Sequence, residues 1–156
     1  MKVISLIVFI LIAYAAGALG AQPVAESIDT WYAELVKPAW NPPSFVFGPV
    51  WFVLYTLMGI AVWRVWNRRY SNPLSENAFI FYAMQLTLNA AWSPLFFGLH
   101  SPFLAFLDIS VLAFLVATTT AIFWRIDKTA GKLLVPYFCW TVFALVLNLS
   151  IWQLNA

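Results

Sequence analysis

The sequence has very little charge for its length of 156 residues. Asp, Glu, Lys and Arg make up 9% of the chain, against roughly 25% in a soluble domain. Hydrophobic residues make up 63%, and the mean hydropathy is +0.85. So few polar side chains cannot cover a fold in water, which excludes a soluble globular protein. The net charge of +2 is scattered along the chain, so nucleic-acid binding is not expected either.

Cysteine, histidine and catalytic motifs are also scarce. Cys139 is the only cysteine, which excludes an intrachain disulfide and a cysteine zinc cluster. The single histidine, His100, lies in a short loop before Pro102, where axial ligation of haem is one reading and an ordinary loop position is the other. The sequence contains no HExxH motif and no glycine-rich phosphate loop. We therefore assign no metal site, no required cofactor and no firm catalytic residue.

Apolar runs of helix length recur along the whole chain. Five of them lie at about residues 4–20, 46–66, 78–98, 103–124 and 133–152. Each is close to the ~20 residues that cross a hydrocarbon core of ~30 Å. The pattern predicts an all-α integral membrane protein, with one transmembrane domain over residues 1–156 that forms a bundle of five transmembrane helices. The first run also fits a cleavable signal peptide, which would leave four helices.

Basic residues are distributed unequally between the two sides of this predicted bundle. Seven of the eight share one side: Lys2, Arg64, Arg68, Arg69, Arg125, Lys128 and Lys132. The other side has only Lys37. Because Lys and Arg are retained in the cytoplasm, the N-terminus is predicted to be cytoplasmic and the C-terminus outside.

The loop at residues 21–45 is long and rich in rings. Its aromatic residues and prolines are Trp31, Tyr32, Trp40, Pro38, Pro42 and Pro43. Prolines restrict the backbone, and Trp and Tyr bring apolar area that is worth burying. The loop is therefore predicted to fold as an ordered lid over the outer face of the bundle.

Polar and aromatic residues form stripes inside three of the predicted helices. The stripes contain Trp51 and Tyr55; Tyr82, Gln85, Asn89 and Trp92; and Tyr137, Trp140, Ala144 and Asn148. One reading is that the amides hydrogen-bond between helices, and the other is that the stripes line a ligand pocket. Trp140 lies near the middle of its run, where anchoring at the lipid headgroups does not explain a tryptophan. Three such walls under an aromatic lid predict a pocket for flat, largely apolar small molecules.

Asp108 lies about five residues inside the fourth predicted helix. An intramembrane carboxylate is a candidate for function by default. A proton relay and a hydrogen bond to another helix are both open for it.

Several segments resemble a known family in order and spacing. They are residues 31–43 (WYAELVKPAWNPP), 46–51 (VFGPVW), 54–55 (LY), 85–98 (QLTLNAAWSPLFFG) and 135–140 (VPYFCW), followed by Asn148. This pattern is similar to the translocator protein (TspO) family, also called tryptophan-rich sensory proteins or peripheral benzodiazepine receptors. The resemblance covers nearly the entire chain.

The resemblance implies five helices with an intact first helix, a homodimer and, for this bacterial-type chain, a place in the bacterial cell membrane. It also implies that protoporphyrin IX or haem binds beneath the first loop. Trp51 and Trp140 match a pair of tryptophans that the family uses around ligands and, in some bacterial members, for light-dependent porphyrin breakdown. Asn89 matches a pocket amide, Ala144 a small pocket residue and Trp31 a lid aromatic.

The family's cholesterol-recognition stretch is incomplete here. It needs a Tyr followed by a basic residue near the end of the fifth helix, but Leu149 and Gln153 stand at those places. Recognition of cholesterol through this motif is therefore not predicted.

The stripes, the lid and the resemblance together give the candidate ligand-binding residues: Trp31, Tyr32, Trp51, Tyr55, Gln85, Asn89, Trp92, Tyr137, Trp140, Ala144 and Asn148. The leading function is a membrane receptor or sensor that binds tetrapyrroles and regulates or traffics them. The alternatives are an enzyme that breaks porphyrin down in light, with Trp51 and Trp140 as its residues, and a transporter of porphyrins or other small hydrophobic ligands. The sequence shows no internal repeat and no paired membrane charges, which disfavours active transport.

Overall fold

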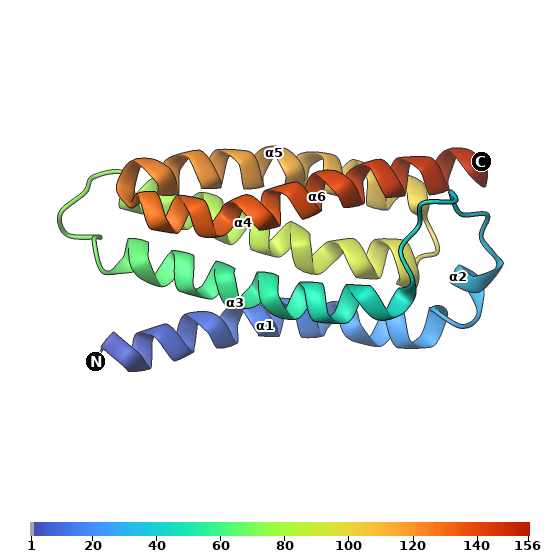
Figure 1. The fold of residues 1–156 in the computed structure, drawn as a ribbon, viewed down its shortest axis with the longest axis horizontal. Helices are drawn as coiled ribbons and strands as arrows, with labels where there is room; N and C mark the ends of the chain where they lie inside the picture. Colours follow the sequence, from blue (N-terminus) through green and yellow to red (C-terminus); the bar gives the residue numbers. More distant parts are fainter. Residues whose placement is uncertain (1) are drawn as a thin grey trace.

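The structure, a computed structural model, describes residues 2–156, and in this range it is a bundle of long helices without strands (Figure 1). The long helices are α1 (Lys2–Ser27), α3 (Phe47–Trp66), α4 (Ser75–Ser93), α5 (Pro102–Ile126) and α6 (Lys128–Leu154). The short elements are α2 (Trp31–Glu34), a 3-10 turn (Ser44–Val46) and a π-helical turn (Pro94–Gly98) that extends α4. The predicted all-helical bundle is confirmed for the described residues.

Four helices have the length and the apolar composition to cross a membrane: Val3–Ser27, Ser44–Trp66, Pro102–Ile126 and Lys128–Leu154. The remaining long helix, α4, is less apolar because it contains the polar stripe with Gln85 and Asn89, both of which are buried. Its crossing of the membrane, and with it the count of five spans, stays a prediction. The chain is nonetheless an integral membrane protein, because four such helices cannot be accommodated in water.

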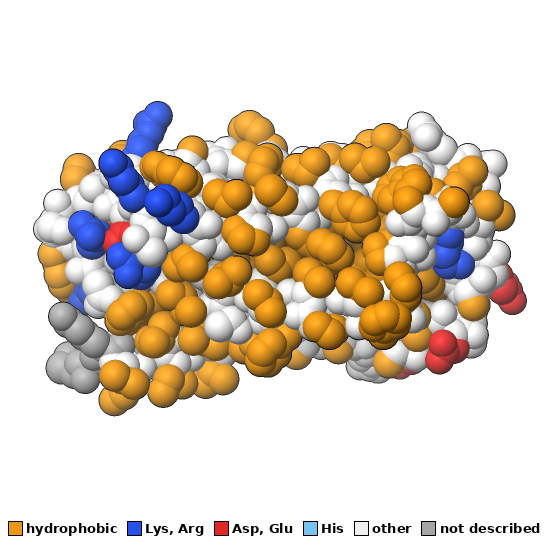
Figure 2. Space-filling model, in the orientation of Figure 1, with side chains coloured by type: hydrophobic (Ala, Val, Ile, Leu, Met, Phe, Trp, Pro, Cys, Tyr) orange, Lys and Arg blue, Asp and Glu red, His pale blue; other side chains and the backbone are white. Residues whose placement is uncertain are grey.

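Large apolar side chains cover the face of the bundle seen in Figure 2 along most of its length. Phe52, Val53, Val111 and Phe114 are each more than half exposed. A contiguous apolar surface of this kind fits lipid as the surrounding solvent.

The two ends of the bundle differ in charge. The basic end contains the α3–α4 connection and the α5–α6 turn, and the lid end contains α2 and the C-terminus (Figure 1). Lys and Arg side chains gather at the basic end (Figure 2). The structure thus brings the basic residues together as the sequence predicted, while the side of the membrane that each end faces stays a prediction.

Helix α1 is longer than the sequence indicated. It ends at Ser27 rather than near residue 20, although Pro23 lies inside it. Proline lacks an N–H and usually ends a helix, but Gln22 Nε2 donates to Glu26 Oε1 at 3.0 Å, one turn apart, and supports the last turns. The loop that forms the lid therefore begins at Ile28 rather than at residue 21.

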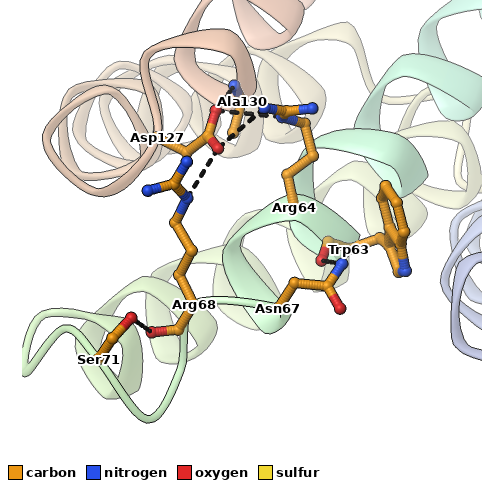
Figure 3. Close-up of polar contacts among 7 residues, drawn as sticks. All are labelled: Trp63, Arg64, Asn67, Arg68, Ser71, Asp127 and Ala130. Carbon is orange, nitrogen blue, oxygen red and sulfur yellow. Dashed lines mark hydrogen bonds and ion pairs between the residues drawn. The ribbon is translucent and has the colours of Figure 1, made fainter. Parts of the chain in front are cut away.

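The basic end is held together by one carboxylate (Figure 3). Asp127 lies between α5 and α6, and its side chain is 3% exposed. Arg64 donates to both of its carboxylate oxygens at 3.1 and 3.0 Å, and Arg68 Nε donates to Oδ2 at 2.9 Å. The Ala130 N–H donates to Oδ1 at 2.9 Å, which makes Asp127 the N-cap of α6. This residue ties α3 to the start of α6, and sequence reasoning did not single it out.

We expect Asp127→Ala to lower the stability of the bundle by about 1–2 kcal/mol, because the N-cap and two charge-assisted contacts are lost while the arginines stay partly hydrated. Burial opposes ionisation of Asp127, but the Arg64 and Ala130 hydrogen bonds and both arginine charges outweigh it and hold the pKa of the carboxyl below its ordinary value. The carboxylate's contribution is therefore complete above the ordinary pKa of about 4 and is lost as the pH falls through the lowered pKa. Melting temperatures measured along an acid series should fall more in the parent than in Asp127→Ala, and equal falls would contradict this role.

Candidate functional site

An aromatic cavity of about 390 Å³ lies between α1, α3, α4 and α6 at the lid end of the bundle. Of the residues that the sequence singled out, these line it: Tyr32, Trp51, Tyr55, Asn89, Trp92, Ala144 and Asn148. Small residues of α1, including Gly17 and Gly20, form the facing wall. A Cβ atom at Gly17 would overlap the ring of Tyr55, so the close approach of α1 to α3 requires glycine there.

Two pairs of stacked rings form flat walls of the cavity. Trp51 stacks on Tyr55 with 5.3 Å between ring centroids, and Trp92 stacks on Phe96 with 5.2 Å. The indole N–H of Trp92 donates to Asn148 Oδ1 at 3.0 Å, and Asn148 Nδ2 in turn donates to the Pro102 carbonyl at 2.8 Å. Asn148 of α6 therefore holds the ring of Trp92, which belongs to α4, in one orientation.

A buried chain of hydrogen bonds supports the floor of the cavity. The Tyr55 hydroxyl donates to Asn89 Oδ1 at 2.8 Å, and Asn89 Nδ2 donates to the Tyr137 hydroxyl at 3.1 Å. The Tyr137 hydroxyl donates onward to Gln85 Oε1 at 2.7 Å. Gln85 and Tyr137 do not line the cavity, whereas Asn89 both lines it and joins three helices. Gln85 and Tyr137 thus make contacts between helices only, whereas Asn89 has both roles that were considered for the polar stripe.

Trp140 lies one layer away from the main cavity. It lines a small annex of about 40 Å³ together with Trp51, Trp92 and Ala144, all of which also line the cavity. Its ring contacts Phe47 and Phe143, with centroid distances of 5.9 and 5.1 Å. Trp51 and Trp140 were both predicted to contact the ligand. In the structure Trp51 lines the cavity, whereas Trp140 lies behind it and lines the annex.

The lid packs against the end of α4 through its aromatic residues. Tyr32 contacts the rings of Phe96 and Phe97, and burial raises the pKa of its hydroxyl although the hydrogen bond to Asn41 lowers it. Trp31 does not line the cavity, because its ring stacks on His100 at 4.5 Å between centroids. The rings of the lid therefore pack against the end of α4 and the loop that follows it.

His100 joins the lid to the end of α1. Its Nε2 lies 3.3 Å from Ser27 Oγ, and the Ser27 hydroxyl donates its one proton to the Phe97 carbonyl at 2.8 Å. Nε2 must then carry the proton that Ser27 Oγ accepts. His100 adopts a left-handed backbone with a φ of 49°, which turns the chain between α4 and α5. These contacts give His100 a structural role at the rim and leave Nε2 engaged.

A second contact ties the middle of the lid to the C-terminus. Asn155 Oδ1 accepts the Val36 N–H at 2.9 Å, and Asn155 Nδ2 donates to the Val36 carbonyl at 2.9 Å. The same Nδ2 donates to the Ile151 carbonyl at 2.7 Å. We call this the Asn155 latch. The sequence offered no signal for it, because a single asparagine near a chain end has no recognisable pattern.

We expect Asn155→Ala to speed proteolysis of residues 28–43 by about fivefold, since opening the lid then breaks two fewer hydrogen bonds, each worth about 1 kcal/mol at most where water competes. Limited proteolysis from the lid side, followed by mass spectrometry, measures this rate. Gln153→Ala, an exposed neighbour on the same helix, should leave the rate unchanged. Equal rates for all three proteins would show that the latch does not hold the lid.

Asp108 lies outside the lining of the cavity. Its Oδ2 is buried and has no hydrogen-bond partner among the described residues. The two readings of Asp108, a proton relay and a hydrogen bond to another helix, stay predictions. Within the described part of the chain, no group of three or more His, Cys, Asp or Glu side chains is arranged to hold a metal ion.

Comparison with known proteins agrees with the sequence pattern. A family model described as the TspO/MBR family matches residues 9–153. A tryptophan-rich protein TspO of Chlorobaculum tepidum is 38% identical over 154 residues, which is 99% of this chain and 98% of that protein. One of the same name from Archaeoglobus fulgidus is 40% identical over the full length of both chains. A human translocator protein is 38% identical over 128 residues, 80% of this chain and 75% of that protein.

Proposed function

Because this chain belongs to the TspO/MBR family, we propose that it is a membrane receptor that binds tetrapyrroles in the cavity beneath its first loop and regulates or traffics them. Protoporphyrin IX and haem are the ligands that we consider. Curated relatives are called translocator protein and tryptophan-rich sensory protein, names that fit ligand traffic and sensing. A homodimer, a bacterial cell membrane and a cytoplasmic N-terminus belong to this proposal as predictions.

The observation that carries the proposal is the shape and chemistry of the cavity. Its volume of about 390 Å³ lies within the range of roughly 300–1,000 Å³ that is usual for small-molecule sites. Flat walls made by Trp51 with Tyr55 and by Trp92 with Phe96 suit a flat aromatic ligand, because offset stacking adds to the burial of apolar area.

Binding through ring contacts, rather than through iron, is the mode that these residues support. The described residues that line the cavity include no histidine, cysteine or methionine. His100 Nε2 is engaged with Ser27, and the Tyr55 hydroxyl is engaged with Asn89. Ring contacts of this kind do not depend on a metal, so free-base porphyrin is as suitable a ligand as haem.

Light-dependent breakdown of porphyrin is a second candidate, supported by one further observation. Trp51 stacks on Tyr55 and lies edge-on to Tyr137 at 6.3 Å between centroids. Trp51 and Tyr55 at the cavity wall, with Tyr137 behind them, form a group of oxidisable rings that can exchange an electron with a photoexcited ligand. In this alternative the porphyrin binds in the same cavity and is then broken down there in light.

One titration tests the proposal and separates the two candidates. Protein in lipid nanodiscs is titrated with protoporphyrin IX in the dark and then illuminated in the presence of oxygen. A receptor should give saturable binding at one site and a Soret band that persists in light, whereas loss of that band with a new product indicates breakdown. Binding that rises linearly with porphyrin and equals that of empty nanodiscs would contradict both.

A further inference from the structure

A hollow of about 660 Å³ opens on the lipid-facing side of the seam between α3 and α6. Val50, Val53 and Leu54 of α3 line it, together with Cys139, Trp140 and Phe143 of α6. We call it the seam groove. Its lining is apolar, and Val53 and Cys139 are exposed to the membrane surroundings. Helices α3 and α6 pack against each other in the bundle.

Trp140 borders both the seam groove and the interior of the bundle. Trp140 lines the groove and also lines the annex that Trp51, Trp92 and Ala144 share with the main cavity. It is thus the residue shared by the lipid-facing groove and the annex beside the candidate ligand site.

The indole of Trp140 is held by ring contacts alone, unlike the indole of Trp92. Trp92 is fixed by its hydrogen bond to Asn148, whereas no partner for Trp140 Nε1 is found among the described residues. Ring contacts with Phe47 and Phe143 hold Trp140 instead, and such contacts are worth only about 0.5–1.5 kcal/mol each. A change of rotamer at Trp140 therefore breaks no hydrogen bond.

Direct side-chain hydrogen bonds between α3 and α6 are found at the basic end of the seam, whereas the lid-end half is joined by ring contacts and, through Asn89 of α4, by the Tyr55–Asn89–Tyr137 chain. Arg64 and Arg68 of α3 bind Asp127 at the start of α6, at the basic end. In the lid-end half of the described helices, no side-chain hydrogen bond joins α3 directly to α6. By contrast, a ligand that entered the cavity beneath the lid would have to pass the Asn155 latch and the contacts of His100.

We propose that the seam groove is a portal through which a flat, apolar ligand dissolved in the bilayer reaches the cavity, with Trp140 as its gate. This proposal rests on the proposed function, since it concerns the same ligand and the same cavity. A porphyrin partitions into lipid, the groove presents rings and apolar side chains to it, and the annex connects the groove with the cavity across Trp140. The groove is a passage, so a change there alters rates of binding rather than affinity.

Two matched substitutions test the portal. Val53→Trp fills the groove from the lipid side without touching the cavity lining, and Val111→Trp places the same ring on the lipid face of α5; the parent valines are 52% and 53% exposed. Protoporphyrin IX is loaded into phosphatidylcholine vesicles and mixed with proteoliposomes by stopped flow, with porphyrin fluorescence as the signal. Val53→Trp should slow association and dissociation together, each by about tenfold, with Kd unchanged within about twofold. Val111→Trp should match the parent.

The chain's only cysteine gives a second, reversible block. A bulky apolar methanethiosulfonate reagent forms a mixed disulfide with Cys139 in the groove, and a reductant removes it again. Association should slow when the reagent is attached and recover after reduction, while Cys139→Ser should not respond. Unchanged rates in both Val53→Trp and the blocked protein would overturn the portal while saturable binding still supports the proposed function. Absence of saturable binding by the parent would overturn both.

Discussion

Trp51→Ala is expected to weaken the binding of protoporphyrin IX more than tenfold. Trp51 lines both the cavity and the annex, and it forms a flat wall with Tyr55. Stacking on its indole contributes about 0.5–1.5 kcal/mol beyond the burial of apolar area, and the area itself contributes about 25 cal/mol per Å². A loss above about 1.4 kcal/mol corresponds to a tenfold change in Kd. Titration in the dark measures the change, and Trp51→Phe should lose less because part of the ring contact survives.

Trp124→Ala is the control for the general effect of removing a tryptophan from this bundle. Trp124 lies near the end of α5, at the basic end, and is 41% exposed. Its loss should leave the affinity for porphyrin unchanged. If Trp51→Ala folds normally and binds as tightly as the parent, the wall formed by Trp51 and Tyr55 is core packing rather than a ligand surface.

Asn89→Leu is expected to destabilise the bundle by about 1–3 kcal/mol, because the buried Tyr55 hydroxyl loses its acceptor and the Tyr137 hydroxyl loses a donor. The same change should weaken porphyrin binding, since Tyr55 is then no longer fixed against Trp51. Unfolding titrations in mixed micelles measure the first effect, and the dark titration measures the second. Leucine has the branching and the number of side-chain heavy atoms of asparagine, although its methyl groups are bulkier than the amide.

Thr87→Leu provides a matched control on the same helix. Thr87 is exposed, and its hydroxyl donates only to the Ala83 carbonyl of its own helix. Its replacement should change neither stability nor binding appreciably. If Asn89→Leu also behaves like the parent, the chain of hydrogen bonds under the cavity does not fix the helices or the site.

Much of the fold could be predicted from the sequence because lipid imposes a strong pattern. Apolar runs of helix length marked the long helices, and the spacing of Gln85, Asn89 and Trp92 placed them on one face of α4, where Asn89 and Trp92 line the cavity. The rings of residues 21–45 indicated a folded lid, and Tyr32 from this segment lines the cavity. These features depend on periodicity and on side-chain type, and both can be read directly from a sequence.

The remaining features depend on contacts between distant segments. Asp127 looked like a loop residue, because only the folded bundle brings Arg64 and Arg68 to it. The same holds for Ser27 and for Asn155, whose partners lie 70 and 119 residues away in the chain. The extra turns of α1 were missed because Pro23 normally ends a helix, whereas here the helix passes through it. The sequence predicted Trp140 as a pocket residue, and in the structure it lines the annex behind the cavity. Helical spacing shows on which face of a helix a residue lies, but not how far it lies from a cavity in the bundle.

The most direct test of the central claim is an experimental structure of the protein with protoporphyrin IX bound in nanodiscs. The account predicts density for the porphyrin ring inside the cavity, in contact with Trp51 and Trp92 and covered by Tyr32. Density for the ring only on the lipid-facing surface, with the cavity occupied by lipid or water, would contradict it.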